Sequence, residues 1–156
     1  MPRPGPADSE RVSVPHSAGD DEDERSLGHL LREARRREAA QVGFYRSLKR
    51  IAREEGSTRE EVRLRELLAD EEEQLSLLAA RLRELGFEPG DIVIPERSSS
   101  FDGWQAEARA REAGEVAFYK AALVRDMDER TRTVLKEILE TERSHRESVM
   151  ASWRSG

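Results

Sequence analysis

A nine-residue segment occurs twice in this chain, each time within a stretch whose apolar residues follow helical spacing. The first copy, REAAQVGFY, covers residues 37–45, and the second, REAGEVAFY, covers residues 111–119. Six of the nine positions are identical, and in both copies a Glu precedes a Tyr by seven residues, about two helical turns. A carboxylate that recurs inside an apolar helical face must find a partner in the folded protein, and this requirement constrains the fold.

The pattern of apolar residues predicts an all-α chain of four helices. Apolar side chains recur at steps of three and four residues, as Leu64, Leu67 and Leu68 show for the second helix. Ser57 or Thr58 is expected to cap that helix. The four predicted helices cover residues 26–56, 57–85, 102–123 and 128–153.

The connections between these helices differ in length. Short turns join the first helix to the second and the third to the fourth, so both pairs are expected to be antiparallel. The link over residues 86–103 reaches about 60 Å when extended, whereas a helix as long as the second measures about 40 Å. The link can therefore run the length of the bundle and set the third helix parallel to the second. We expect a four-helix bundle with one long crossover between helices two and three, which is the ferritin-like topology.

The first 25 residues differ in composition from the rest. They hold four of the six prolines and an acidic run, with few large apolar residues, so they cannot bury enough surface to offset the entropy of ordering. We therefore expect a disordered tail over residues 1–25 and one helical domain over residues 26–156. Val12 and Val14 leave open a role for the tail in docking to a partner or to a larger shell.

Charge and composition exclude several classes of function. The net charge of −6 provides no basic surface for nucleic acid or an anionic membrane, and no apolar run approaches the length of a membrane span. The chain has no Cys, which excludes disulfides, thiolate nucleophiles and iron–sulfur clusters. Because its start lacks a signal-peptide pattern, the protein is expected to be soluble and cytoplasmic.

Acidic residues interrupt the apolar face of every predicted helix. They lie at similar distances from the two short turns, so antiparallel pairing is expected to bring acids from all four helices to one level of the core. No Lys or Arg on the same faces offers to pair with them. The alternative is that each acid lies at the edge of its face and extends to water. The residues are Glu38, Glu71, Glu112, Glu115 and Glu142, with His145 one turn beyond the last.

A layer of unpaired carboxylates in a dry core needs protons or cations to neutralise it. Oxygen-rich ligation with one imidazole suits Fe or Mn, whereas the lack of thiolates argues against structural zinc. The segment ETERSH at residues 140–145 places Glu142 and His145 on one helical face at adjacent turns. Together with acids from the other three helices, this E-x-x-H motif predicts a dinuclear metal site.

Superposing the two halves of the chain relates these positions to one another. The chain reads as a duplicated helix pair in which each half contributes ligands across a pseudo-twofold axis. The halves differ, since the first has Gln where the second has Glu115 and His145. The aligned pairs are Glu38 with Glu112, Gln41 with Glu115, Glu71 with Glu142 and Gln74 with His145.

These segments resemble the ferritin-like di-iron carboxylate proteins, and most closely the rubrerythrin-like branch. The resemblance covers roughly residues 28–153 and rests on both copies of the repeat, on the thirty-three-residue step from Glu38 to Glu71, and on ETERSH. It implies a site for two iron ions. By analogy the bridging carboxylates are Glu71 and Glu142, the terminal ones Glu38 and Glu112, and the remaining ligands His145 for one iron and Glu115 for the other.

Gln74, in DEEEQ at residues 70–74, departs from the family pattern. The family usually has a His there, which completes a second E-x-x-H and takes over one iron in the reduced state. An amide oxygen is a weaker neutral donor for iron than an imidazole nitrogen. The carboxylate-dominated ligand set therefore favours oxidation of Fe(II) over efficient peroxide-reductase cycling.

The expected function is that of a non-haem di-iron oxidoreductase which oxidises Fe(II) with O₂ or H₂O₂, in iron handling or protection against oxidative stress. Tyr45 and Tyr119 are expected near the site, as hydrogen-bond partners of carboxylates, as traps for oxidising equivalents, or simply as core aromatics. Without Cys, turnover needs an external electron donor or Fe(II) itself as donor. The apolar faces favour a homo-oligomer. The alternative is a non-catalytic ferritin-like scaffold or interaction module with a degenerate metal site.

Overall fold

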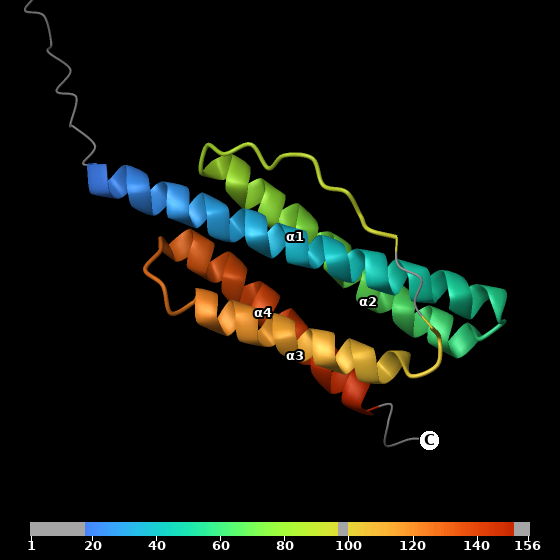
Figure 1. The fold of residues 1–156 in the computed structure, drawn as a ribbon. Helices are drawn as coiled ribbons and strands as arrows, with labels where there is room; N and C mark the ends of the chain where they lie inside the picture. Colours follow the sequence, from blue (N-terminus) through green and yellow to red (C-terminus); the bar gives the residue numbers. More distant parts are fainter. Residues whose placement is uncertain (1–17, 97–99, 152–156) are drawn as a thin grey trace, which may run out of the picture.

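The computed structural model describes residues 18–96 and 100–151, and this part of the chain forms four helices without strands (Figure 1). The prediction of an all-α chain with four helices is therefore confirmed. Residues 1–17, which include Val12 and Val14, and residues 152–156 lie outside the described part. The helices are α1 (Ala18–Glu54), α2 (Thr58–Glu84), α3 (Trp104–Ala122) and α4 (Glu129–Ala151).

The first helix begins earlier than the sequence predicts. Residues 18–25, assigned to the tail, form the first two turns of α1, and all of them are exposed. An exposed turn needs no apolar face, so the apolar pattern could not reveal it. Asp20 and Asp21 lie in the first turn, where negative charge interacts favourably with the helix dipole.

Two glycines end the helices of the first pair. Gly56 and Gly86 have φ values of +72° and +84°, in the left-handed region that Gly adopts without steric cost. In the turn after α1, the backbone N–H of Ser57 donates to Ala52 O at 2.8 Å, which is the bond pattern of a Schellman turn. Ser57 is the N-cap residue of α2, as expected from the sequence, but its side chain makes no capping hydrogen bond.

The helices pack as two pairs, α1 with α2 and α3 with α4, and the pairs close around a shared interior. Two apolar clusters fill this interior. One cluster includes Leu31 and Leu135, and the other includes Leu48 and Leu64. Along each helix the acidic positions predicted from the sequence fall between the stretches that supply the two clusters, so the acids form a layer within the bundle.

The connection from α2 to α3 lies along the outer side of α1. Arg35 Nη1 donates to Pro89 O at 2.8 Å, and further along the helix a Cβ at Gly43 would lie 2.3 Å from Pro95 O. In Figure 1 this connection returns along the bundle, so α2 and α3 point the same way. The close approach of Pro95 O leaves no room for a side chain at position 43. This explains why the first repeat has Gly43 where the second repeat has Ala117.

Within the described ranges, none of the helices has the combination of length and apolar character that a membrane span requires.

Candidate metal centre

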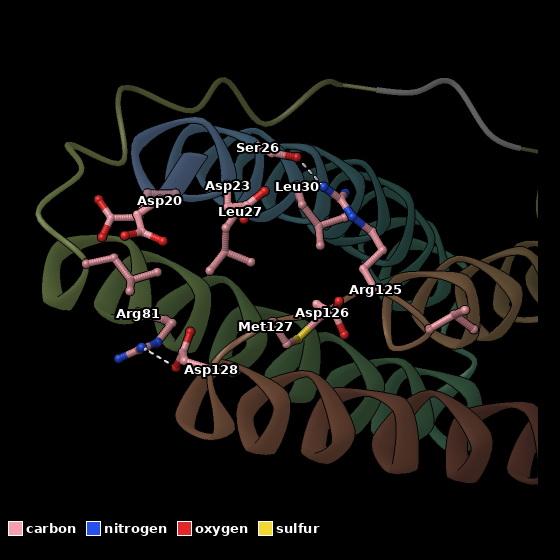
Figure 2. Close-up of a pocket in the computed structure, with 13 residues that line it drawn as sticks. Asp20, Asp23, Ser26, Leu27, Leu30, Arg81, Arg125, Asp126, Met127 and Asp128 are labelled. Atoms are coloured by element: carbon pink, nitrogen blue, oxygen red, sulfur yellow. Dashed lines mark hydrogen bonds and ion pairs between the residues drawn. The ribbon is translucent and has the colours of Figure 1, made fainter. Parts of the chain in front are cut away.

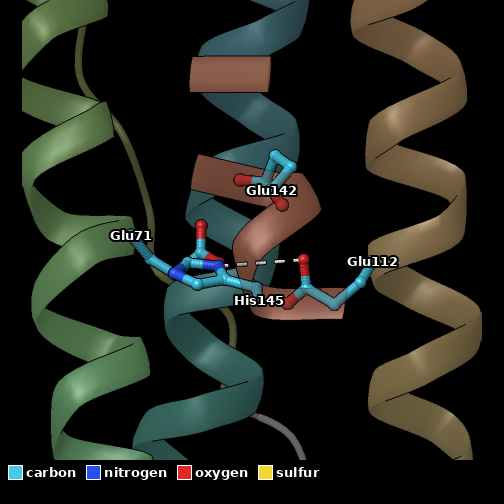
Figure 3. A group of neighbouring side chains, drawn as sticks. All are labelled: Glu71, Glu112, Glu142 and His145. Carbon is cyan, nitrogen blue, oxygen red and sulfur yellow. Dashed lines mark ion pairs between the residues drawn. The ribbon is translucent and has the colours of Figure 1, made fainter. Parts of the chain in front are cut away.

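Carboxylates from three helices and one imidazole meet in the middle of the bundle (Figure 3). Glu71 of α2, Glu112 of α3, and Glu142 and His145 of α4 each offer one ligand atom, and these atoms all lie within 4.8 Å of one another. All four side chains are buried. The group has the donor types and spacing of a cluster that could hold a metal ion.

The remaining helix contributes Glu38. This side chain of α1 is fully buried, and its carboxyl group contacts that of Glu71. It lies outside the group of four whose ligand atoms meet within 4.8 Å. All four helices thus contribute an acid to the layer, with Glu38 adjoining the central group through Glu71.

The two tyrosines of the repeat each bond the carboxylate of the other half. Tyr45 of α1 donates to Glu112 Oε1, and Tyr119 of α3 donates to Glu38 Oε1. Burial and the neighbouring carboxylates raise the pKa of both phenols well above its ordinary value. Both tyrosines therefore remain protonated, and each fixes one carboxylate oxygen.

Arg37 pairs with Glu115, contrary to the expectation that the acids lack a basic partner. Arg37 Nη2 lies 2.9 Å from Glu115 Oε1, and Nε donates to Oε2 at 3.2 Å. Glu115 is not part of the central group. Its pseudo-twofold counterpart, Gln41, accepts a longer bond of 3.4 Å from Arg111. Both arginines precede a layer acid by one residue, and their length lets them reach across to the opposite helix.

His145 is held from both sides of its ring. Nδ1 lies 3.2 Å from Glu71 Oε1 and 3.8 Å from Glu112 Oε2, and Nε2 lies 2.9 Å from Asp70 Oδ2. An acceptor on the outer nitrogen directs the inner nitrogen toward the carboxylates, as acidic partners of metal-binding histidines do. Asp70 was not predicted from the sequence, because a residue next to Glu71 falls off the apolar face. The available signal was that a metal-binding histidine usually has an acceptor at its second ring nitrogen, so an acid near His145 could have been sought.

Burial dominates the electrostatics of the layer. It raises the pKa of Glu142 to about 12 and that of Glu71 well above its ordinary value, and the neighbouring carboxylates raise both further. Burial also raises the pKa of Glu38, to about 7, although the adjoining carboxyl of Glu71 and the hydrogen bond from Tyr119 oppose it. Without a cation, the layer therefore holds protons at neutral pH.

Many polar atoms of the layer have no hydrogen-bond partner. Both carboxylate oxygens of Glu71 and of Glu142 lack one among the described residues, and so does Nδ1 of His145. Unpartnered buried oxygens cost free energy, and a bound cation would satisfy several of them at once. The donor set, mostly carboxylate with one imidazole, fits Fe or Mn.

Gln74 lies outside the central group. Its side chain is 2 % exposed, and neither its Oε1 nor its Nε2 has a hydrogen-bond partner among the described residues. It faces a cavity between α2 and α4. The amide is therefore placed beside the layer, one turn from Glu71.

A larger cavity, of about 960 Å³, lies at one end of the bundle, between the first turns of α1 and the turn that joins α3 to α4 (Figure 2). Its cationic side chains are engaged with neighbours: Arg81 pairs with Asp128 at 2.7 Å, and Arg125 bonds Ser26. The bonds of Arg81 connect the end of α2 to the start of α4. We assign this cavity no ligand.

No family model matches the chain, and no curated protein matches it.

Proposed function

We propose that the protein is a ferritin-like di-iron carboxylate protein that binds two Fe(II) ions in the layer and promotes their oxidation by O₂ or H₂O₂. The observation that carries the proposal is the buried group Glu71, Glu112, Glu142 and His145, whose ligand atoms lie within 4.8 Å of one another and whose oxygens are largely unpartnered. A buried acidic layer of this kind lowers the stability of the fold, and bound metal ions would offset that loss by neutralising the carboxylates.

The residues divide into ligands and positioning groups. Glu71 and Glu142 would be shared by the two ions, as the resemblance to di-iron carboxylate proteins implies; none of their four oxygens has a hydrogen-bond partner among the described residues. His145 offers Nδ1 while Asp70 holds Nε2. The proposed terminal ligands, Glu38 and Glu112, each accept a bond from a tyrosine at one oxygen, and the other oxygen has no hydrogen-bond partner among the described residues.

The reaction takes Fe(II) as substrate. Two Fe(II) ions lose one electron each, and the two electrons with two protons reduce O₂ to H₂O₂; with H₂O₂ as oxidant, they yield two molecules of water. The carboxylates stabilise the ferric products because their negative charge favours the higher oxidation state. Since the chain has no Cys, continued turnover as a peroxidase needs an external electron donor.

The ferritin-like assignment also proposes that the α2–α3 connection is the crossover of that topology. The parallel course of α2 and α3 in Figure 1 supports this assignment. So does the reciprocal pattern of the repeats, in which each tyrosine bonds the opposite half. Duplication of a helix pair accounts for both features.

The decisive experiment measures anaerobic Fe(II) binding to the metal-free protein and then the ferric absorbance after rapid mixing with O₂. We expect two Fe(II) per bundle and fast oxidation in the wild type. Glu142→Gln and His145→Ala should abolish the fast phase, whereas Glu147→Ala, which removes an exposed acid of the same helix, should leave it unchanged. Glu142→Gln keeps the side-chain volume and mimics the protonated acid, so its fold should persist.

The second candidate is a non-catalytic bundle, and the pairing of Glu115 with Arg37 is the observation that favours it. An arginine that neutralises one of the expected ligands reduces the negative charge available to a second ion. Binding of fewer than two ions, with oxidation no faster than in Glu142→Gln, would support this candidate and contradict the di-iron proposal.

A further inference from the structure

A cavity of about 310 Å³ opens between α2 and α4 directly beside the carboxylate layer. Its outer wall includes the exposed side chains of Glu73 and Glu137, and its inner wall includes the buried Gln74. Gln74 is one helical turn from Glu71. The cavity therefore extends from the surface of the bundle to the edge of the candidate metal centre.

The unequal repeat explains why the cavity exists. In the pseudo-twofold alignment Gln74 corresponds to His145, and Thr141 corresponds to Asp70. On one side of the layer, the imidazole of His145 and the carboxylate of Asp70 meet at 2.9 Å. On the other side, the hydroxyl of Thr141 donates to the backbone of Glu137, and the amide of Gln74 has no partner among the described residues. Gln74 and Thr141 do not meet across the interface as His145 and Asp70 do, and the cavity lies between α2 and α4 at this level.

The cavity suits a hydrated divalent cation. Three carboxylates line it, from Asp70, Glu73 and Glu137, and none of its lining residues is Lys or Arg. The carboxylates of Glu73 and Glu137 are exposed and form no ion pair with any described residue. The buried amide of Gln74, 2 % exposed and facing the cavity, adds an unpartnered neutral oxygen donor at the inner end. Hard cations prefer oxygen donors of this kind.

We propose that this cavity is a transit site for Fe(II), which binds at Glu73 and Glu137 and passes along Gln74 to Glu71 of the metal centre. The inference rests on the proposed function, because a route to the layer matters only if the layer binds metal. Acidic side chains at the mouth of a cavity raise the local cation concentration and the rate of association. The route predicts that the cavity residues control the rate of metal loading and leave the final occupancy unchanged.

The test is anaerobic loading of the metal-free protein with Co(II), followed by stopped-flow absorbance, with the final occupancy measured by equilibrium dialysis. Glu73→Gln/Glu137→Gln should slow loading about tenfold at low ionic strength and leave the occupancy unchanged. Glu66→Gln/Glu147→Gln makes the same change in charge on the same two helices, at exposed positions outside the cavity, and should load within about twofold of the wild type.

A second variant removes the inner donor. Gln74→Leu replaces an unpartnered buried amide with an apolar group, so it should maintain or raise stability while slowing Co(II) loading. Equal loading rates in the cavity and control double variants, or an unslowed Gln74→Leu, would overturn the transit site and leave the metal centre standing. A wild type that binds no Co(II) would overturn both proposals.

Discussion

Tyr45 of α1 donates a hydrogen bond to Glu112 of α3, joining the tyrosine of the first repeat to the acid of the second. The reciprocal bond runs from Tyr119 to Glu38. A cation–π contact also joins the two repeats: the guanidinium carbon of Arg37, in the first repeat, lies 4.6 Å from the ring centroid of Phe118, in the second. The repeated segments thus form the interface between α1 and α3, and each copy satisfies the other.

Removing either phenol hydroxyl should destabilise the metal-free protein. Tyr45→Phe leaves Glu112 Oε1 with only the longer bond, 3.4 Å, from Gln41 Nε2, and loss of a buried partner costs about 1–3 kcal/mol. Urea unfolding in EDTA should show a comparable loss for Tyr119→Phe. A double-mutant cycle of Tyr45→Phe with Glu112→Leu, which removes the acceptor, should give a coupling energy of about 1 kcal/mol or more. A coupling near zero would mean that the hydroxyl is not an effective partner of Glu112.

The sequence predicted the level of the acids better than it predicted their partners. Helical spacing places Tyr45 on the same face as Glu38, two turns away, but the bond goes to Glu112. Because α1 and α3 are antiparallel, the step of two turns from Glu38 forward to Tyr45 on α1 corresponds to the step from Tyr119 back to Glu112 on α3. This pairing depends on which helices face each other, and a pattern within one helix does not contain that information.

The same limit applies to Asp70 and Arg37. Each is adjacent in sequence to a layer acid, so the apolar pattern places it off the core face. Asp70 nevertheless reaches His145, and Arg37 reaches Glu115, because both side chains extend across to another helix. Contacts from the edges of helices depend on interhelical geometry, whereas the buried acids could be identified from periodicity alone.

Gly43 and Gly114 provide a matched test of the path taken by the α2–α3 connection. A Cβ at Gly43 would lie 2.3 Å from Pro95 O, whereas the nearest atom to a Cβ at Gly114 would be Arg37 Nη2 at 3.9 Å. Gly43→Ala should lower the free energy of unfolding by about 1–3 kcal/mol through displacement of the connection. Gly114→Ala should raise it by about 0.5–1 kcal/mol, as expected for Gly to Ala within a helix. Equal effects in thermal or urea unfolding would place the connection elsewhere.

Arg37 should weaken metal binding by holding Glu115. Arg37→Gln releases that carboxylate and removes a positive charge near the layer, so affinity for Mn(II) should rise about tenfold in an EPR titration. Arg111→Gln is the matched control, since Arg111 makes the equivalent ring contact with Phe44 but bonds Gln41. It should change the affinity much less.

A double variant identifies which effect of Arg37 dominates. If the released carboxylate binds the ion, Arg37→Gln/Glu115→Gln should return the affinity toward that of the wild type. Equal gains in the Arg37 and Arg111 variants would instead indicate that general charge near the layer, rather than Glu115, sets the affinity.

The metal-free protein should lose stability as pH rises. The pKa of Glu38 is about 7 in the folded protein against an ordinary value of 4.5, so between these values the folded state binds more protons than the unfolded state. The free energy of unfolding therefore falls through this window, with a share from Glu38 of about 3 kcal/mol. The raised pKa of Glu142, about 12, extends the decline above pH 7.

Urea unfolding in EDTA from pH 5 to pH 8 measures this decline, and Glu38→Gln should flatten it relative to the exposed-site control Glu66→Gln. Mn(II) should have the opposite dependence, because metal binding requires the carboxylates to release their protons and so strengthens as pH rises. The ion should then restore the most stability at pH 8, where the metal-free layer is least stable. Parallel pH profiles for the wild type and Glu38→Gln would show that Glu38 does not titrate in this window and would contradict the prediction.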